Sequence, residues 1–329
     1  MKKAAFLLGV ILCWFTSINL AFAETKIGVI LPMTGDFAQY GNKVRQGLES
    51  ARPEGVRYIY EDEGCSPKTA VSAHQKLTAV DGVQLLVGPW CGSPQTAVAS
   101  LLPKSGQIAL LGSSAPERVF ELSGGRMLSV QPSIEQESIF NAEQAYRLGA
   151  RNVVIVFLEN DFSRAHEAAF RGHFKGKVLE TLTYNAPDAS ALRSIVLRIK
   201  QLNPDSLYIP DAFPLMHGLL GQVHNLGLKD LKIFSVYSAQ SDDVLKAIGP
   251  VGEGLMISYP QIEGEALLYY PGLVSNILGQ ALKTCPKADS DCVLAAIKSV
   301  SKFDKYGVLA GKLGLKVVRA GKFEWSHEG

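Results

Sequence analysis

Short apolar runs alternate with segments of helical periodicity along most of this chain. Several runs are apolar at nearly every position, which is typical of parallel strands covered on both faces. The expected strands are Thr25–Leu31, Val56–Tyr60, Gln84–Val87, Ile108–Leu111, Val153–Phe157, Val178–Leu182, Ser206–Ile209, Lys232–Val236 and Leu255–Ser258. The clearest helical stripe between them consists of Leu192, Ile195, Val196, Ile199 and Leu202. This alternation predicts an α/β fold with doubly wound sheets.

The strands fall into two groups, which predicts two lobes. The first four strands form one unit, and those between Val153 and Val236 form the second. Met127–Pro132 and Met256–Pro260 are extended and end at proline, so we interpret them as strands that cross between the lobes. Two helical stretches follow, Ala266–Lys283 and Asp291–Val300. A hairpin is expected at the end, from Leu315–Arg319 through Ala320-Gly321 to Lys322–Trp325.

The first 23 residues have the pattern of a signal peptide. Lys2 and Lys3 precede an apolar run, and Ala21-Phe22-Ala23 is an A-x-A cleavage site. We therefore expect export to the periplasm and cleavage after Ala23. The apolar run is shorter than the about 20 residues that a membrane span requires. Glu24–Gly329 would then be the mature chain of 306 residues, a length that favours two domains.

Charge and composition exclude several partners. Removing Lys2 and Lys3 from the 33 basic residues leaves 31, equal to the 31 acidic residues, and no basic stripe stands out. Nucleic acid and anionic membrane are therefore poor partners. We expect a monomer that has no cofactor.

Four cysteines remain after Cys13 is removed with the signal peptide, and an even count in an exported chain favours disulfides. Three pairings are possible, and the local choice is Cys65–Cys91 with Cys285–Cys292. Closing these loops contributes about 3.5 and about 2.5 kcal/mol of chain entropy, respectively. The alternative is free or metal-bound thiols, but the chain has no C-x-x-C pair, so no metal site is expected.

Motifs for catalysis are weak, and we expect no enzyme. The chain has no G-x-S-x-G, H-E-x-x-H or phosphate-loop motif. His166 and His173 lie seven residues apart, as do His217 and His224, and we interpret them as solvated helix positions. In the acidic run Glu61-Asp62-Glu63, Asp62 is expected to order its loop while its neighbours stay exposed.

A ligand site is expected at the loops that follow the strands. Ligands of open α/β sheets bind beyond the carboxyl ends of strands. Helix N-termini there carry free N–H groups and partial positive charge, which suit a carboxylate. The loops at these positions are Met33–Tyr40, Trp90–Gln95, Gly112–Ala115, Glu159–Ser163, Pro210–Pro214 and Tyr237–Ser241.

Four segments in order carry a family likeness. Ile27–Gly41 is an apolar strand that enters a glycine-rich loop. Tyr60–Val71 matches a YDDxCDPKQAV pattern, Leu86–Ser93 a viGhxCSS pattern and Gly112–Glu117 a GATxPEL pattern. Together they resemble the leucine/isoleucine/valine-binding-protein family of periplasmic solute-binding proteins, which serve ABC importers. The resemblance covers about Thr25 to Pro260 and then weakens, because the family usually has one more helix there.

The resemblance implies a type I periplasmic-binding-protein fold, in which three crossovers join two Rossmann-like lobes around a ligand cleft. The third crossover would fall near Leu309–Lys312. Lobe 1 would then comprise residues 24–131 and 261–310, and lobe 2 residues 132–260 and 311–329. The spacing of Cys65 and Cys91 is close to that of the family disulfide. The lobes would close on the ligand by a hinge motion, and the membrane permease of an ABC importer would recognise the closed form.

The resemblance also implies individual site residues. Ser114 matches a residue that holds the carboxylate and ammonium of an amino acid, and Ser113 precedes it. Gly92 stands where the family has a serine that binds the carboxylate, so Ser93 would have to supply the hydroxyl. Aromatic residues of the family pocket match three positions of this chain: Tyr40, Phe162 and Phe213, with Ala212 in place of Phe213 if the alignment shifts by one.

One position departs from the family pattern. Amino-acid-binding members have an acidic residue after the strand that matches Lys232–Val236, where it pairs with the ligand ammonium. This chain has Ser238 there, or Tyr237 under a shift. Either Asp211 in the neighbouring loop supplies the charge, or the ligand has no ammonium. Asp211 is more simply a turn residue after Pro210. The expected ligand is a branched-chain-like amino acid or a related small carboxylate. The alternative is a sensor subunit for a small organic acid or amide that works with a separate membrane receptor.

Overall fold

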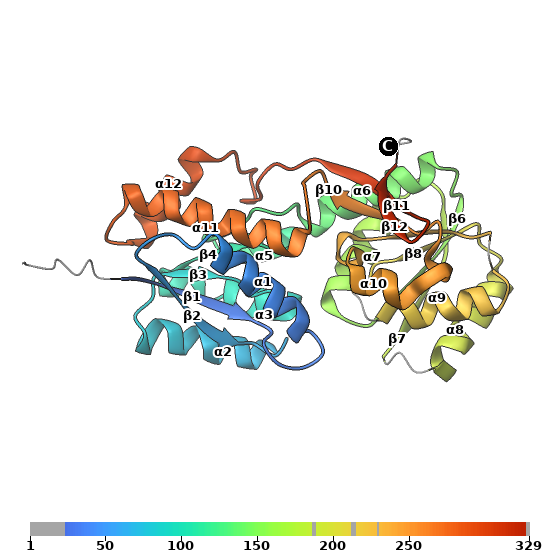
Figure 1. Cartoon of the computed structure of the whole chain (residues 1–329), viewed down its shortest axis with the longest axis horizontal. Coiled ribbons are helices and arrows are strands. Elements are labelled where there is room, and N and C mark those ends of the chain that lie inside the picture. The colour runs from blue at the N-terminus through green and yellow to red at the C-terminus, as the bar shows by residue number, and fades with distance from the viewer. Residues whose placement is uncertain (1–23, 186–188, 212–214, 229, 327–329) are drawn as a thin grey trace, which may run out of the picture.

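The computed structural model describes residues 24–185, 189–211, 215–228 and 230–326. They form two α/β lobes that lie side by side along the long axis of the molecule (Figure 1). No helix within these ranges is both long enough and apolar enough to cross a membrane.

The first lobe has a five-stranded parallel sheet in the order β2-β1-β3-β4-β5. Its strands are β1 (Thr25–Leu31), β2 (Val56–Asp62), β3 (Leu85–Val87), β4 (Ile108–Leu111) and β5 (Met127–Ser129). Its helices are α1 (Ala38–Ser50), α2 (Pro67–Gln75) with a π-helical extension at Lys76–Val80, α3 (Gly92–Ala99), α4 (Leu102–Ser105), α5 (Glu117–Leu122), α11 (Ala266–Thr284) and α12 (Ser290–Val300). The two α/β lobes expected from the strand pattern are therefore present.

The second lobe has a seven-stranded sheet in the order β12-β11-β10-β9-β8-β6-β7, which is parallel except for the pairings of β11. Its strands are β6 (Asn152–Leu158), β7 (Lys177–Tyr184), β8 (Ser206–Ile209), β9 (Lys232–Ser235), β10 (Met256–Pro260), β11 (Leu313–Arg319) and β12 (Lys322–Trp325). Its helices are α6 (Ile134–Arg147), α7 (Asp161–His173), α8 (Ala189–Leu202), α9 (Leu215–Asn225) and α10 (Asp242–Ile248), with 3₁₀ turns at Tyr237–Ala239 and Gly249–Gly252.

Burial explains why the apolar runs form central strands. In β1, the side chains of Val29 and Leu31 pack toward α1 and α11, whereas that of Ile30 packs toward α2 and α3. All three side chains are at most 1% exposed. A strand covered on both faces needs apolar residues at successive positions, so the continuous runs in the sequence follow directly from this layering.

The chain passes between the lobes three times. It leaves the first sheet after β5, returns after β10 to form α11, and leaves again after Val308, which bridges to Ser129 of β5. Helix α11 then packs along α1, which lies far from it in sequence (Figure 1). The residue limits of the lobes given above remain a prediction.

A close backbone approach fixes helix α1 at the end of β1. A Cβ atom added to Gly41 would lie 1.9 Å from the carbonyl oxygen of Pro32. Replacing Gly41 with alanine is therefore expected to lower the free energy of unfolding by about 1–3 kcal/mol, because helix and loop must separate. Gly221 in α9 is the matched control, since its added Cβ meets no atom within 4 Å. Alanine there should stabilise by up to about 1 kcal/mol. Urea denaturation of both variants measures the difference, and equal effects would refute the packing argument.

Candidate functional site

A cavity of about 220 Å³ lies between the lobes, at the carboxyl ends of strands from both sheets. The first lobe contributes Phe37, Cys65, Trp90, Cys91, Gly92, Ser93, Gln95 and Ser114, and the second contributes Asn160, Asp161, Phe162, Tyr237 and Ser238. Five of the predicted site residues therefore line one cavity: Gly92, Ser93, Ser114, Phe162 and Ser238. Its volume is below the range of about 300–1,000 Å³ that is usual for ligand pockets, so it suits a small ligand.

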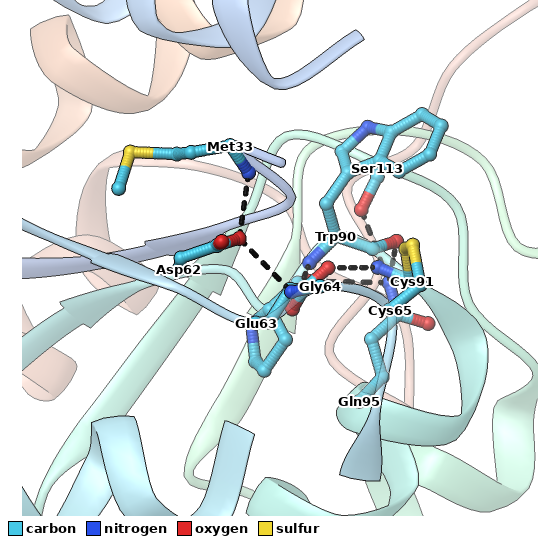
Figure 2. Close-up of a disulfide and its surroundings, with 10 residues drawn as sticks. Met33, Asp62, Glu63, Gly64, Cys65, Trp90, Cys91, Gln95 and Ser113 are labelled. Carbon is cyan, nitrogen blue, oxygen red and sulfur yellow. Dashed lines mark hydrogen bonds between the residues drawn. A yellow bond between two sulfur atoms is a disulfide. The ribbon is translucent and has the colours of Figure 1, made fainter. Parts of the chain in front are cut away.

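The N-terminus of helix α3 lines the cavity on the side of the first lobe. Cys91 is the N-cap residue, and its side chain makes no capping hydrogen bond. Two backbone N–H groups that precede the helix, those of Trp90 and Cys91, donate to the Glu63 carboxylate at 3.3 and 2.8 Å (Figure 2). The N–H groups of the first turn, at Gly92 and Ser93, therefore remain next to the cavity, with the partial positive charge of a helix N-terminus.

Gln95 fixes the loop that carries the two adjacent serines. Its amide nitrogen donates to Ser113 Oγ at 3.1 Å and to the carbonyl oxygen of Ser114 at 3.3 Å. Ser113 is thus held by Gln95 and does not line the cavity (Figure 2). Ser114, one residue further, does line it.

Aromatic side chains make the first-lobe wall apolar. Trp90 stacks on Tyr40 with a ring-centroid distance of 5.1 Å, and Phe37 lies 6.5 Å from Trp90. Tyr40 is 4% exposed and lies behind Trp90, outside the lining. Of this stacked pair, Trp90 lines the cavity and Tyr40 supports it from behind. Trp90 belongs to one of the loops expected at the site but was not among the predicted ligand-binding residues. Its position directly before the N-cap of α3 is the sequence signal that points to it.

Both predicted local disulfides are present, Cys65–Cys91 and Cys285–Cys292. The first forms part of the cavity wall and ties the loop after β2 to the start of α3 (Figure 2). Glu63 with these two cysteines is the one cluster of potential metal ligands among the described residues. Because the two sulfur atoms are bonded to each other, they are not available as thiolate ligands.

The N-terminus of helix α7 forms part of the second-lobe wall. Asn160 caps it by accepting from the backbone N–H of Ser163 at 2.9 Å. Phe162 in the first turn packs edge-on against His166, with ring centroids 4.5 Å apart. Across the cavity, a Cβ atom added to Gly92 would lie 3.6 Å from both Asp161 Cβ and Phe162 N. The first turns of α3 and α7 therefore meet across the cleft.

A buried carboxylate positions the turn that carries Ser238. Glu137 of α6 accepts from the backbone N–H of Tyr237 at 2.8 Å and from Ser258 Oγ at 2.5 Å. Burial raises the pKa of Glu137 to about 7, although both donors lower it. Burial also raises the pKa of Tyr237 to about 12. Ser114 lies close enough to the Tyr237 phenol to lower the pKa of Tyr237, but the Ser114 hydroxyl has no hydrogen-bond partner among the described residues.

Asp211 is a buried structural residue rather than a turn residue. Its carboxylate accepts from the backbone N–H of Leu158 at 2.9 Å and from Ser163 Oγ at 3.1 Å, and it also accepts from the Tyr184 hydroxyl. Burial raises its pKa to about 6 against these donors. Asp211 does not line the cavity.

Two expectations about exposure were wrong. Glu63 is fully buried, because it accepts the two backbone N–H groups of the Cys91 loop, and burial raises its pKa to about 8. His166 is also fully buried, because α7 turns that face toward α6, where Ser138 Oγ lies 2.7 Å from Nδ1. Burial lowers the pKa of His166 to about 3.

Other expectations stand or lie outside the described part. Asp62 orders its loop as expected by accepting from the N–H groups of Met33 and Gly64 (Figure 2). Burial opposes the effect of these bonds and the bond from Thr34, yet the pKa of Asp62 is lowered. Phe213 and its alternative Ala212 lie outside the described residues.

Three polar atoms at the cavity are buried and have no hydrogen-bond partner within the described residues: Ser114 Oγ, Ser238 Oγ and Trp90 Nε1. The serines are 3% and 4% exposed and come from different lobes. An unpaired buried polar atom costs about 1–3 kcal/mol. All three belong to residues that line the cavity.

Comparison with known proteins agrees with this architecture. A family model described as "Periplasmic binding protein" matches residues 24–266. The leucine-, isoleucine-, valine-, threonine- and alanine-binding protein of Pseudomonas aeruginosa is 24% identical over 277 residues, which cover 75% of this chain and 69% of the relative.

Solved structures share the fold along nearly the whole chain. A leucine-binding protein from Thermotoga maritima has a TM-score of 0.82 at 21% identity, covering 92% of this chain and 97% of the other. A solute-binding protein of an ABC transporter from R. palustris, in complex with 4-hydroxybenzoate, has a TM-score of 0.79 at 21% identity, covering 91% and 94%. These structures confirm the fold class. Since the family model also matches well over half of its length, the chain belongs to the periplasmic binding protein family.

Proposed function

We propose that this protein is the substrate-binding component of an ABC importer and captures a small carboxylate in the cleft between its lobes. The carrying observation is the cavity itself, which is lined by the first turn of α3 and by Ser114 and Ser238, two serines whose hydroxyls have no partner among the described residues. Backbone N–H groups at a helix N-terminus and serine hydroxyls together suit a carboxylate.

The relatives support the same ligand chemistry. The Pseudomonas protein is named for branched-chain and small amino acids, and the R. palustris structure holds 4-hydroxybenzoate. A carboxylate is the group that these ligands share. The partner would be a membrane permease, and the mature protein would work in the periplasm after cleavage behind Ala23. The proposed role is binding rather than catalysis, because the Pseudomonas relative and the Thermotoga structure are both named as binding proteins.

The binding role predicts that Ser114→Ala weakens ligand affinity by about tenfold or more, because a hydrogen bond to a charged group contributes about 1.5–3 kcal/mol. Candidate acids and amino acids are first ranked by thermal shift, and affinity is then measured by calorimetry. Ser72→Ala is the control, since the Ser72 hydroxyl donates to Lys68 O on the surface of α2, away from the cavity. The proposal fails if no small carboxylate binds, or if both variants bind like the wild type.

Trp90 offers a direct optical measurement. The mature chain has two tryptophans, Trp90 at the cavity and Trp325 in β12. In a Trp325→Phe background, the emission of Trp90 should shift on addition of ligand, while small-angle scattering reports the compaction expected of lobe closure.

A further inference from the structure

We propose that the cavity selects a carboxylate that has no ammonium group and has a planar apolar body, such as an aromatic monocarboxylate. This inference rests on the proposed function, because it assigns the ligand class of the same cavity. It follows from the charges that line the cavity, from the buried carboxylates that do not reach it and from the shape of its apolar walls.

The lining suits a carboxylate better than an ammonium. No lining residue among those described is basic, and Asp161 is the one acidic residue. The groups at hand are therefore hydroxyls and N–H donors: Ser114 and Ser238, Trp90 Nε1, and the first turn of α3, a helix of eight residues. Ser114 and Ser238 are more than nine-tenths buried and unpaired. A carboxylate accepts from all these donors. The serine hydroxyls can also accept from an ammonium, but none of these groups carries the negative charge that a buried ammonium requires.

The three buried carboxylates near the cavity are committed elsewhere. Glu63 accepts from the N–H groups of Trp90 and Cys91, and Glu137 accepts from the N–H of Tyr237 and the hydroxyl of Ser258. Asp211 accepts from Leu158, Ser163 and Tyr184. None of the three lines the cavity. An ammonium placed there would be buried without an anionic partner, which is strongly unfavourable.

Asp161 is the remaining possible partner. It is an exposed residue in the first turn of α7, where a carboxylate is stabilised by the helix N-terminus. Because water screens an exposed charge pair, an ammonium would gain little there. Removing the charge of Asp161 should therefore not weaken the binding of an amine-free acid.

The apolar walls fit a flat ring. Phe37, Trp90, Phe162 and Tyr237 line the cavity from both lobes, together with the Cys65–Cys91 disulfide. Aromatic rings pack favourably in offset or edge-on contact at centroid distances of about 4.5–7 Å. The small volume of about 220 Å³ limits the body to about the size of one ring or a short branched chain.

Matched pairs of probes test the inference, because the members of each pair differ by an amino group. Calorimetry compares 3-phenylpropanoate with phenylalanine and 4-methylpentanoate with leucine, and benzoate serves as a compact aromatic probe. The amine-free acid of each pair should bind at least tenfold tighter than its amino acid. Equal or tighter binding of the amino acid overturns the inference while the proposed function stands. If none of these carboxylates binds, the inference is rejected, and the wider screen of acids and amino acids then decides the proposed function.

Two substitutions locate the cause of the preference. Ser238→Asp places a carboxylate in the wall and should weaken acid binding by at least about tenfold while narrowing or reversing the preference over the amino acid. Ser241→Asp is the control, since Ser241 is the N-cap of α10 and lies outside the lining, and aspartate also caps helices.

Asp161→Asn should raise acid affinity by about two- to fivefold. Loss of leucine binding in Asp161→Asn, with leucine the tighter ligand of the wild type, would show that Asp161 holds an ammonium and would refute the inference.

Discussion

Replacing Glu137 with alanine is expected to lower the free energy of unfolding by about 3–5 kcal/mol, from two lost hydrogen bonds and the void left behind. The side chain is buried and joins α6 to the Tyr237 turn and to β10. Its removal leaves the Tyr237 N–H without its acceptor and opens a void beside His166, whose Nε2 is unpaired and lies 3.8 Å from the carboxylate. Since the same turn carries Ser238, ligand affinity should fall as well.

Glutamine at this position separates charge from shape. Its side chain would keep an acceptor for Tyr237 and Ser258 and would direct its amide N–H₂ toward His166 Nε2, as a protonated glutamic acid would. Glu137→Gln is therefore expected to fold, whereas Glu137→Ala loses stability at every pH.

The stability difference between the wild type and Glu137→Gln depends on pH, and the direction of this dependence follows from the pKa of Glu137. The folded-state pKa of Glu137, about 7, is raised above its unfolded value of 4.5. The folded state thus favours the protonated form, and this contribution to stability is lost as pH rises from about 4.5 through 7. Glu63 and Asp211 act in the same direction, and His166, whose pKa is lowered to about 3, acts in the opposite direction on acidification.

Denaturant unfolding at pH 5 and pH 8 measures this difference. Relative to the wild type, Glu137→Gln should gain about 2–3 kcal/mol between the two pH values, since one pKa unit corresponds to 1.36 kcal/mol. The other titrating groups are common to both proteins and cancel in the comparison. Parallel pH profiles for the two proteins would mean that Glu137 is ionised in the fold throughout.

Removing the Cys65–Cys91 disulfide is expected to destabilise the protein by about 3.5 kcal/mol and also to weaken ligand binding. The bond closes a loop with a sequence separation of 26 and forms part of the cavity wall. Without it, the loop after β2 is no longer tied to the first turn of α3, whose residues Gly92 and Ser93 line the cavity. The substitutions are Cys65→Ala with Cys91→Ala.

The second disulfide is the matched control. Cys285–Cys292 has a sequence separation of 7 and joins α11 to α12, away from the cavity. Its double alanine variant should lose about 2.5 kcal/mol and keep its ligand affinity. Melting temperature and calorimetric affinity are measured for both variants. Equal loss of affinity in the two variants would show that general destabilisation, rather than the wall, governs binding.

Much of the fold was readable from local pattern. The expected strand Thr25–Leu31 has those limits in the structure, and Ile108–Leu111 and Ser206–Ile209 do so too. Most of the others shift by one or two residues at their ends, as with Val56–Tyr60, which extends to Asp62. Patterns of this kind are local consequences of burial on both faces of a sheet, so a single sequence displays them.

The site was only partly readable. Strand order and helix N-termini indicated the correct loops, and five predicted residues line the cavity: Gly92, Ser93, Ser114, Phe162 and Ser238. Tyr40 does not, because Trp90 stacks between it and the cavity side of the loop. Which of two neighbouring aromatic residues faces a ligand depends on side-chain packing, and residue type alone carries no information about it.

The sequence by itself determined the α/β class, the strand positions and the loops at which a ligand can be held, because these follow from periodicity and from the direction of parallel strands. Only the tertiary structure decided which charged groups are buried and which partners they bind. Glu63, Glu137, His166 and Asp211 are polar in sequence, yet all four are buried, because backbone N–H groups and hydroxyls distant in the chain come within reach of them. Asp161 is the one carboxylate that lines the cavity among the described residues, since Glu63, Glu137 and Asp211 are held by long-range contacts that no local pattern encodes.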